Sequence, residues 1–267
     1  MAMIFSELFL VILNKMYKIF GKLNFFIKLK NHRVKKLNDF FKNNDLVVMN
    51  GPFSGMKYPS LYSNCSSIFP KIIGSYESEL EPTFKYLFGK SFSTIINIGS
   101  AEGYFAIGLG LRFPNSTVYA FEMNQKAQNF CKKMGKLNNI KNVIYEGKFD
   151  PYYLNKLQFN NSLVICDIEG VEKEIFTSSN ISNFINSWLI IEVHDFIHHN
   201  LSKIISENFQ NTHNVIKIKS RSDLQKILNY KFHEPEKFYF LTKKFLYSEY
   251  RPNKLCWLFI EPKANNE

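Results

Sequence analysis

Two glycines and an acidic residue carry the clearest chemical signal in the sequence. Gly99 and Gly103 frame a turn between the apolar run 94–98 and a helical pattern that opens at Tyr104. Glycine permits positive φ and close approach of backbone to a ligand, and the free N–H groups at a helix start favour an anionic group. Glu122 ends the next apolar run, 19 residues after Gly103. A dinucleotide fold places its ribose-binding acid at a similar distance, roughly 20 residues on.

The spacing of this turn discriminates among nucleoside cofactors. The turn is G-x-x-x-G, whereas a pyrophosphate needs G-x-G-x-x-G for its close approach. A nucleoside with an amino-acid tail therefore fits better than NAD, and S-adenosylmethionine is such a ligand. The predicted cofactor contacts are Asn97, Gly99, Ala101, Glu102, Gly103, Tyr104, Glu122 and Asp167. The alternative interpretation is a helix–strand contact made by small residues.

Further polar residues follow the fourth and fifth apolar runs. Asp167 and Glu169 end one run, and Glu192, His194 and Asp195 end the other. Ligands of open parallel sheets lie outside the carboxyl ends of the strands, so these side chains are expected to converge. His194 is the first candidate for a general base, because an imidazole with the ordinary pKa of about 6.5 is largely neutral in the cell. Asp167 is the second. The alternatives are a hydrogen-bonded histidine at a strand end and a helix-capping acid.

Substrate and metal contacts are less sharply indicated. The predicted substrate contacts are Glu169, Glu192, Asp195 and Arg251. Arg251 would meet an anionic group, or it is an ordinary surface arginine. His194 and His198 have the i, i+4 spacing of two ligands on one helical face, so a divalent metal held with Asp167 or Glu192 is the alternative. Because residues 189–193 read as a strand, the sequence favours a site without metal.

The elements that must position these residues follow from the apolar pattern. From residue 94 onward, short β-branched runs alternate with helical patterns, which indicates a parallel sheet covered on both faces. The predicted strands are 94–98, 117–121, 143–146, 163–167, 189–193, 215–219 and 254–260. A helix over 127–137 is predicted to end at Asn138 and Asn139. Residues 46–73, with several Gly and Pro, predict irregular or edge structure leading to a helix near Glu77.

Composition sets the broad class. A chain of 267 residues with 45% hydrophobic residues can bury one large core, which excludes disorder and collagen-like repeats. We assign residues 46–267 to one α/β domain and residues 1–45 to a basic amphipathic helical segment. The four cysteines form no C-x-x-C pair, so neither a disulfide framework nor a zinc ribbon is indicated and a reducing cytoplasm is expected. The net charge of +11 favours an anionic partner.

The N-terminal segment leaves two interpretations open. No window reaches the roughly 18 uncharged residues of a membrane-spanning helix, and Glu7 argues against a signal peptide. Apolar residues recur at three- and four-residue spacing opposite three lysines. That stripe consists of Phe5, Leu8, Phe9, Ile12, Met16, Ile19, Phe20 and Leu23. It would pack on the protein's own body or on a second subunit, or it would lie on anionic lipid as a peripheral contact through residues 1–36.

Three further stretches resemble a known family. CDIEGVEKEIF (166–176), LIIEVHDF (189–196), and GPFSGMKYP with GSYESELEP upstream are similar to the FkbM-like group of class I S-adenosylmethionine-dependent methyltransferases. The resemblance covers about residues 50–260. It implies a Rossmann-like seven-stranded, mostly parallel sheet with an antiparallel last strand and helices on both faces. It also implies S-adenosylmethionine as methyl donor. Asn97 stands where the family usually has an acid, and an amide lacks the charge-assisted hydrogen bond.

The resemblance also implies an acceptor class. We expect O-methylation of a hydroxyl of a sugar in a glycan, glycolipid or secondary metabolite. The net charge favours nucleic-acid methylation as an alternative, but the N-P-P-Y or D-P-P-Y loop is absent after the fourth run, so no nucleic-acid partner is expected. A third alternative is a protein that binds the cofactor without turnover and acts as a membrane-associated partner. A homo-oligomer is compatible with each of these alternatives.

Overall fold

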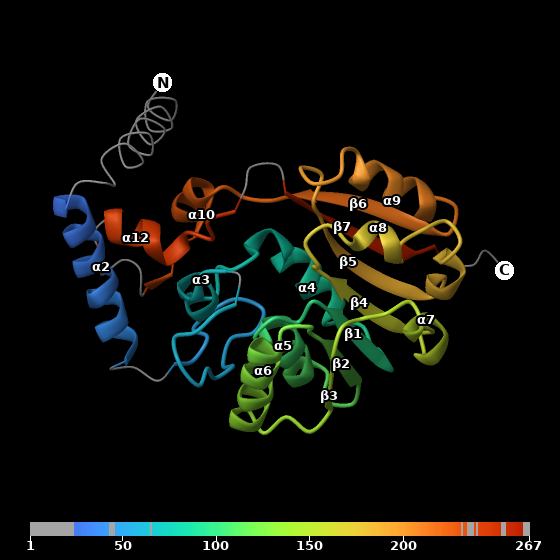
Figure 1. Cartoon of the computed structure of the whole chain (residues 1–267), viewed down its shortest axis with the longest axis horizontal. Helices are drawn as coiled ribbons and strands as arrows, with labels where there is room; N and C mark the ends of the chain where they lie inside the picture. Colours follow the sequence, from blue (N-terminus) through green and yellow to red (C-terminus); the bar gives the residue numbers. More distant parts are fainter. Residues whose placement is uncertain are drawn as a thin grey trace.

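A seven-stranded sheet forms the centre of the molecule. The computed structural model describes residues 24–42, 46–64, 66–230, 232–233, 238, 240–251 and 255–263. The strands are β1 (Thr94–Ile98), β2 (Thr117–Phe121), β3 (Val143–Glu146), β4 (Ser162–Cys166), β5 (Ser187–Val193), β6 (His213–Lys219) and β7 (Cys256–Pro262). Their order is β3-β2-β1-β4-β5-β7-β6 (Figure 1). Among these strands, β7 alone runs in the opposite direction to the other six, so it is antiparallel to both β5 and β6. The predicted Rossmann-like α/β fold with an antiparallel last strand is confirmed.

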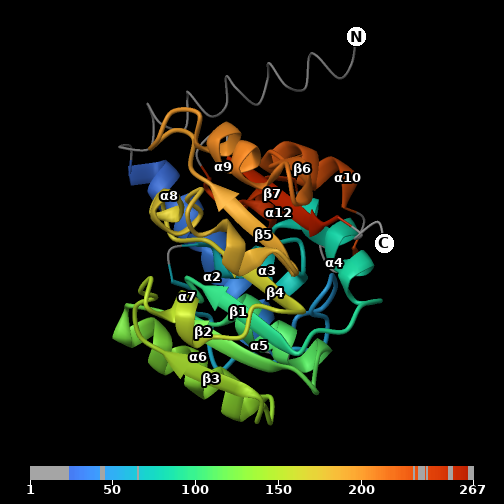
Figure 2. The same ribbon diagram turned by 90° about the vertical axis from the view of Figure 1, so that its right-hand side faces the viewer.

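Helices cover both faces of the sheet because successive strand residues point to opposite sides. The helical elements are α2 (Asn24–Lys42), α3 (Ile68–Ile73), η1 (Ser78–Leu80), α4 (Glu81–Leu87), α5 (Tyr104–Arg112), α6 (Gln125–Leu137), α7 (Tyr153–Lys156), α8 (Glu172–Ile175), η2 (Ile181–Phe184), α9 (Leu201–Phe209), α10 (Asp223–Asn229) and α12 (Phe240–Tyr247). In β1, Ile95 packs with α5 in one buried cluster, and Ile96 and Ile98 pack with α8 and α9 in another. Figure 2 shows the twist of the sheet between these layers.

The structure adjusts several predicted boundaries. Strand β4 ends at Cys166, which is fully buried, so Asp167 begins the following loop. Helix α6 ends at Leu137 with Asn138 as its C-cap and Asn139 at a φ of 55°, as predicted. The segment 46–73 was expected to be irregular, but it contains α3. Pro70 lies in the first turn of that helix, where its missing N–H is tolerated.

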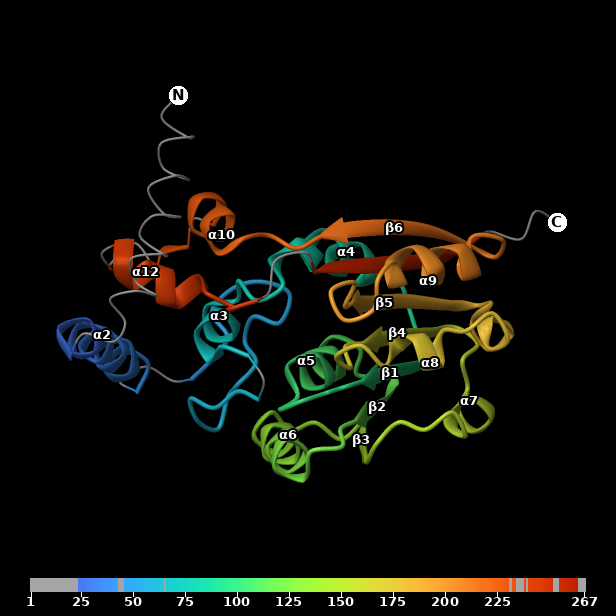
Figure 3. The same ribbon diagram turned by 45° about the horizontal axis from the view of Figure 1, so that its top comes forward.

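The segment before β1 and the segment between β6 and β7 meet beyond the carboxyl ends of the parallel strands. Figure 3 shows α3, α10 and α12 on the side where the β6 arrow ends, with α2 farther out. Leu37 and Phe41 of α2 are fully buried, and Phe41 stacks on Phe69 with ring centroids 5.6 Å apart. Here the described part of the N-terminal segment packs on the protein's own body. The stripe from Phe5 to Leu23 lies outside the described residues, so its lipid or subunit contact stays a prediction.

No described helix is both long enough and apolar enough to cross a bilayer.

Candidate functional site

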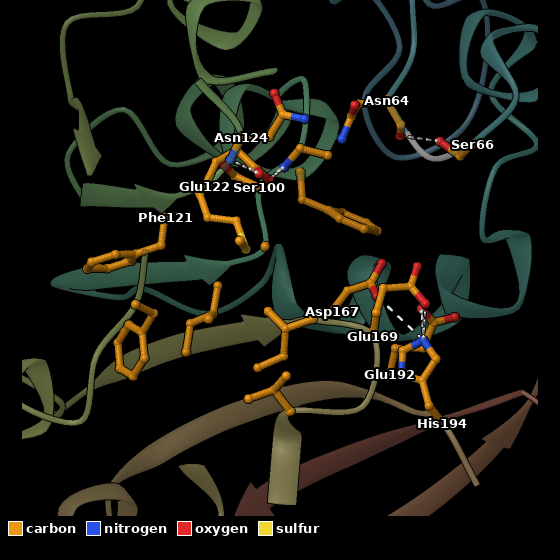
Figure 4. Close-up of a pocket in the computed structure, with 18 of the residues that line it drawn as sticks. Asn64, Ser66, Ser100, Phe121, Glu122, Asn124, Asp167, Glu169, Glu192 and His194 are labelled. Carbon is orange, nitrogen blue, oxygen red and sulfur yellow. Dashed lines mark hydrogen bonds and ion pairs between the residues drawn. The ribbon is translucent and has the colours of Figure 1, made fainter. Parts of the chain in front are cut away.

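A cavity of about 620 Å³ lies at the carboxyl ends of the parallel strands (Figure 4). Of the predicted site residues, Gly99, Ala101, Tyr104, Glu122, Asp167, Glu169, Glu192, His194 and Arg251 line it. They come from the ends of β1, β2, β4 and β5, from the start of α5 and from the segment after α12. The expected convergence of the strand ends is therefore met. The volume is in the usual range of about 300–1,000 Å³ for small-molecule sites.

The glycine turn after β1 forms one wall of the cavity. Gly99 has a φ of 82°, and a Cβ there would lie 1.9 Å from the Asp167 carbonyl oxygen. Gly103 has a φ of 107°, and its Cβ would lie 2.6 Å from the Cys131 sulfur. Both glycines thus let the turn pack against β4 and α6, and Gly103 itself does not line the cavity. The Ser100 hydroxyl is buried in the wall and has no hydrogen-bond partner among the described residues.

Glu122 lies beside this turn with its carboxylate fixed. One oxygen, Oε2, accepts a hydrogen bond from Ala101 N at 2.8 Å, and the other, Oε1, accepts one from Asn124 N at 2.7 Å. Each carboxylate oxygen can accept a further hydrogen bond. Figure 4 shows Glu122, Ser100 and Asn124 together, across the cavity from His194. The arrangement can hold two neighbouring hydroxyls of a ribose.

His194 lies at the opposite side among four carboxylates. Its side chain is 2% exposed. Nδ1 lies 2.9 Å from Glu172 Oε1, and Nε2 lies 3.3 Å from Glu169 Oε2, 3.6 Å from Glu192 Oε2 and 3.9 Å from Asp167 Oδ1. Burial lowers the pKa of His194, but the hydrogen bonds and charges of these carboxylates outweigh it and raise the pKa to about 10. This raised pKa favours the protonated imidazole over the neutral form expected of a general base.

Asp167 and Glu192 form a close acidic pair in the same wall. Burial raises the pKa of Asp167 above its ordinary value. Burial, followed by the charge of Asp167, raises the pKa of Glu192 well above its usual range. Ligand atoms of Asp167, Glu192 and His194 lie within 4.8 Å of one another, so these three could hold a metal ion. His198, the second histidine of the predicted metal pair, instead lines a separate cavity with Lys173.

Arg251 is an internal ion-pair partner and not a surface arginine. Its guanidinium pairs with Glu77 and Glu192, lies 3.1 Å from Glu249 Oε2, and donates to the Tyr76 hydroxyl at 3.0 Å. The side chain is 17% exposed. Because acidic partners surround the guanidinium, it has little capacity left for an anionic substrate. Its evident effect is to tie the segment after α12 to the wall of the cavity.

Three other predicted residues lie away from the cavity. Asp195 accepts hydrogen bonds from Ser202 N at 2.8 Å and Ser202 Oγ at 2.6 Å, which fixes the start of α9. Glu102 is fully buried and pairs with Lys71. Asn97 is also fully buried, with Nδ2 3.5 Å from the Ile165 carbonyl oxygen. None of the three side chains lines the cavity.

Sequence reasoning missed two residues that shape the site. Lys71 lines the cavity, and its ammonium lies 4.5 Å from the centre of the Tyr76 ring. No motif or spacing marks this lysine. Glu172, which holds Nδ1 of His194, is in the CDIEGVEKEIF stretch, so the stretch itself was a signal that could have identified it.

Comparisons with known proteins find solved structures with a similar fold and low sequence identity. No family model and no curated protein matches the sequence. An rRNA methylase from Streptococcus thermophilus is 9% identical with a TM-score of 0.49, covering 70% of this chain and 97% of that chain. A precorrin-6y C5,15-methyltransferase from Geobacter metallireducens GS-15 is 12% identical with a TM-score of 0.43, covering 69% and 89%. TYW2 from M. jannaschii, in complex with AdoMet, is 15% identical with a TM-score of 0.37, covering 67% and 72%. With such low values, the fold assignment depends on the strand order, and no activity carries over.

Proposed function

We propose that this protein is an S-adenosylmethionine-dependent O-methyltransferase whose acceptor is a hydroxyl of a sugar. The observation that carries the proposal is the fixed carboxylate of Glu122, beside the Gly99 turn and in the same cavity as the strand-end acids. A ribose-binding acid and a row of strand-end carboxylates in one cavity suit a nucleoside donor next to a hydroxylated acceptor.

The residues present fit the donor. Glu122 would accept hydrogen bonds from the ribose hydroxyls, and the unpartnered Ser100 hydroxyl would meet a polar group of the amino-acid tail. Met123 and Phe149, which line the cavity near Glu122, would contact the adenine. S-adenosylmethionine, when bound, supplies a methyl group on a sulfonium. Asn97 lies outside the lining, so its missing charge does not weaken this assignment.

The strand-end acids would position the acceptor and receive its proton. Carboxylates accept hydrogen bonds from sugar hydroxyls, and correct orientation of two reactants contributes as much as about 7–11 kcal/mol to catalysis. Asp167 is the proposed proton acceptor, because its raised pKa makes it a stronger base than an exposed aspartate. With S-adenosylmethionine bound as the methyl donor, Asp167 would take the proton of the acceptor hydroxyl as its oxygen accepts the methyl group and the carbon–sulfur bond breaks. His194, in contact with these carboxylates, would hold them in place.

Charge distribution favours a sugar over RNA. Residues 1–45 hold nine Lys and Arg against three Asp and Glu, so they supply six of the eleven net positive charges. The cavity lining holds more acidic than basic side chains, with Asp167, Glu169, Glu174, Glu192 and Glu249 against Lys71, Lys148 and Arg251. A polyphosphate backbone is repelled by such a surface, because nucleic-acid binding depends on lysine and arginine. A neutral polyol is not repelled.

Transfer of labelled methyl groups tests the proposal. The protein is incubated with methyl-labelled S-adenosylmethionine and three acceptor sets: sugars and glycolipids, RNA, and no acceptor. We expect labelled methyl groups in the sugar set. Asp167→Asn should lower kcat by roughly 10²- to 10⁴-fold. Label confined to RNA would instead establish the nucleic-acid alternative. Cofactor binding without transfer to any acceptor would favour a protein without turnover.

A further inference from the structure

Four carboxylates surround the imidazole of His194 at the wall of the cavity, and they fix the orientation of its ring. Glu172 lies behind His194, fully buried, with its Oε1 2.9 Å from Nδ1. Nε2 therefore faces the cavity, where Asp167, Glu169 and Glu192 surround it. Histidines that bind metals are usually fixed in this way, with a carboxylate on the ring nitrogen away from the metal.

The acidic pair has free oxygens aimed at the same point. Glu192 is only 3% exposed, and Arg251 pairs with its Oε1, which leaves Oε2 on the side of His194, 3.6 Å from Nε2. Asp167 Oδ1 is buried and has no hydrogen-bond partner in the described part of the chain. Because this oxygen is 3.9 Å from Nε2, it is too far for a hydrogen bond with the imidazole. A buried oxygen without a partner needs a donor or a cation.

We infer that Asp167, Glu192 and His194 form a divalent-cation site in the wall of the cavity. Their ligand atoms lie within 4.8 Å of one another. For three atoms this close there is always a point within about 2.8 Å of all of them, and oxygen–cation bonds of roughly 2.0–2.6 Å need only a small contraction. Two carboxylates with one imidazole match Mg²⁺ or Mn²⁺ better than a soft metal. Glu169, which is 68% exposed, can move aside or serve as a fourth ligand.

The cation would act on the acceptor, and this role depends on the proposed function. The open cavity leaves coordination positions for water or an acceptor hydroxyl. A hydroxyl bound there loses its proton more readily, because the cation stabilises the alkoxide. The proton would pass to Oδ2 of Asp167 while Oδ1 faces the cation, and the acceptor oxygen would then bond to the methyl carbon as the carbon–sulfur bond breaks. Mn²⁺ binding itself does not depend on methyl transfer.

Binding of Mn²⁺ to the full-length, chelator-treated protein tests the inference. Titration followed by electron paramagnetic resonance should show one bound ion per chain. Asp167→Asn and Glu192→Gln should each weaken binding by at least about tenfold, and Glu172→Gln should weaken it about 10- to 100-fold by releasing the imidazole. Glu207→Gln removes the same charge from an exposed surface pair with Lys203, so its affinity should equal that of the unmodified chain.

A second measurement needs no variant that could fail to fold. Substoichiometric Mn²⁺ should broaden the imidazole NMR signals of His194 before those of the other five histidines. No saturable binding up to millimolar Mn²⁺, earlier broadening at His198, or full affinity in Asp167→Asn would overturn the site. Cofactor titrations in chelator separate the two proposals. Mn²⁺ binding without cofactor binding defeats only the methyltransferase, and the reverse result defeats only the cation site.

Discussion

The turn after β1 gives a prediction whose magnitude follows from the structure. In Gly99→Ala, the new Cβ would lie 1.9 Å from the Asp167 carbonyl oxygen and 2.9 Å from its carbonyl carbon, although Cβ atoms essentially never approach other atoms within 3.0 Å. Both contacts are with backbone, so the turn or the end of β4 must move by about 1 Å or more. The left-handed φ of 82° further destabilises the folded state, by about 1–2 kcal/mol, when the residue has a Cβ.

Gly55 supplies a matched control. Its φ is 93°, and a Cβ there would meet nothing within 4 Å. Gly55→Ala should therefore lower the free energy of unfolding only by the cost of the left-handed backbone, about 1–2 kcal/mol. Gly99→Ala should lower it by at least about 4 kcal/mol. Thermal unfolding followed by circular dichroism should place the two midpoints at least about 4–8 °C apart. Equal midpoints would refute the argument that close approach of Asp167 requires glycine at position 99.

Three further predictions concern buried polar groups. Lys71→Met leaves Glu102 buried without its cation, so the free energy of unfolding measured in urea should fall by about 3–5 kcal/mol. The double variant Lys71→Met with Glu102→Gln should recover most of this stability. If the two substitutions instead destabilise additively, a direct ion pair is contradicted. In chelator, the folded pKa of His194 is about 10 against an ordinary 6.5, so its stabilising contribution is complete below pH 6.5 and is lost as the pH rises through about 10. An NMR titration midpoint near 6.5 would contradict this. Asn97→Asp buries a carboxylate where the amide oxygen has no partner, so stability should fall by roughly 2 kcal/mol or more; an unchanged urea midpoint would count against it.

The sequence predicts the frame of the site because the signals of that frame are local. Runs of β-branched residues mark the strands. Gly99 and Glu122 are identifiable because a tight turn requires a positive φ and because the strand–helix–strand unit sets the distance to the acid. Of the cofactor contacts predicted on this side, Gly99, Ala101, Tyr104 and Glu122 line the cavity, whereas Asn97, Glu102 and Gly103 do not.

Pairings between distant segments escape this reasoning. Lys71 meets Glu102 across 31 residues, and Arg251 meets Tyr76 across 175. Such contacts depend on how α3 and the segment after α12 pack over the strand ends, and no local pattern encodes them. The raised pKa of His194 is not predictable from the sequence for the same reason, since it is set by carboxylates that the loops after β4 and β5 bring together.

Calorimetric titration with S-adenosylhomocysteine tests the central claim most directly. The unmodified chain should bind one equivalent, and Glu122→Gln should bind roughly 10- to 150-fold more weakly, because a charged hydrogen bond contributes about 1.5–3 kcal/mol. Glu146→Gln, the same change at the end of β3 and outside the cavity lining, should bind like the unmodified chain. An unmodified chain that releases no heat of binding, or a Glu122→Gln variant with undiminished affinity, would contradict a nucleoside held at this carboxylate.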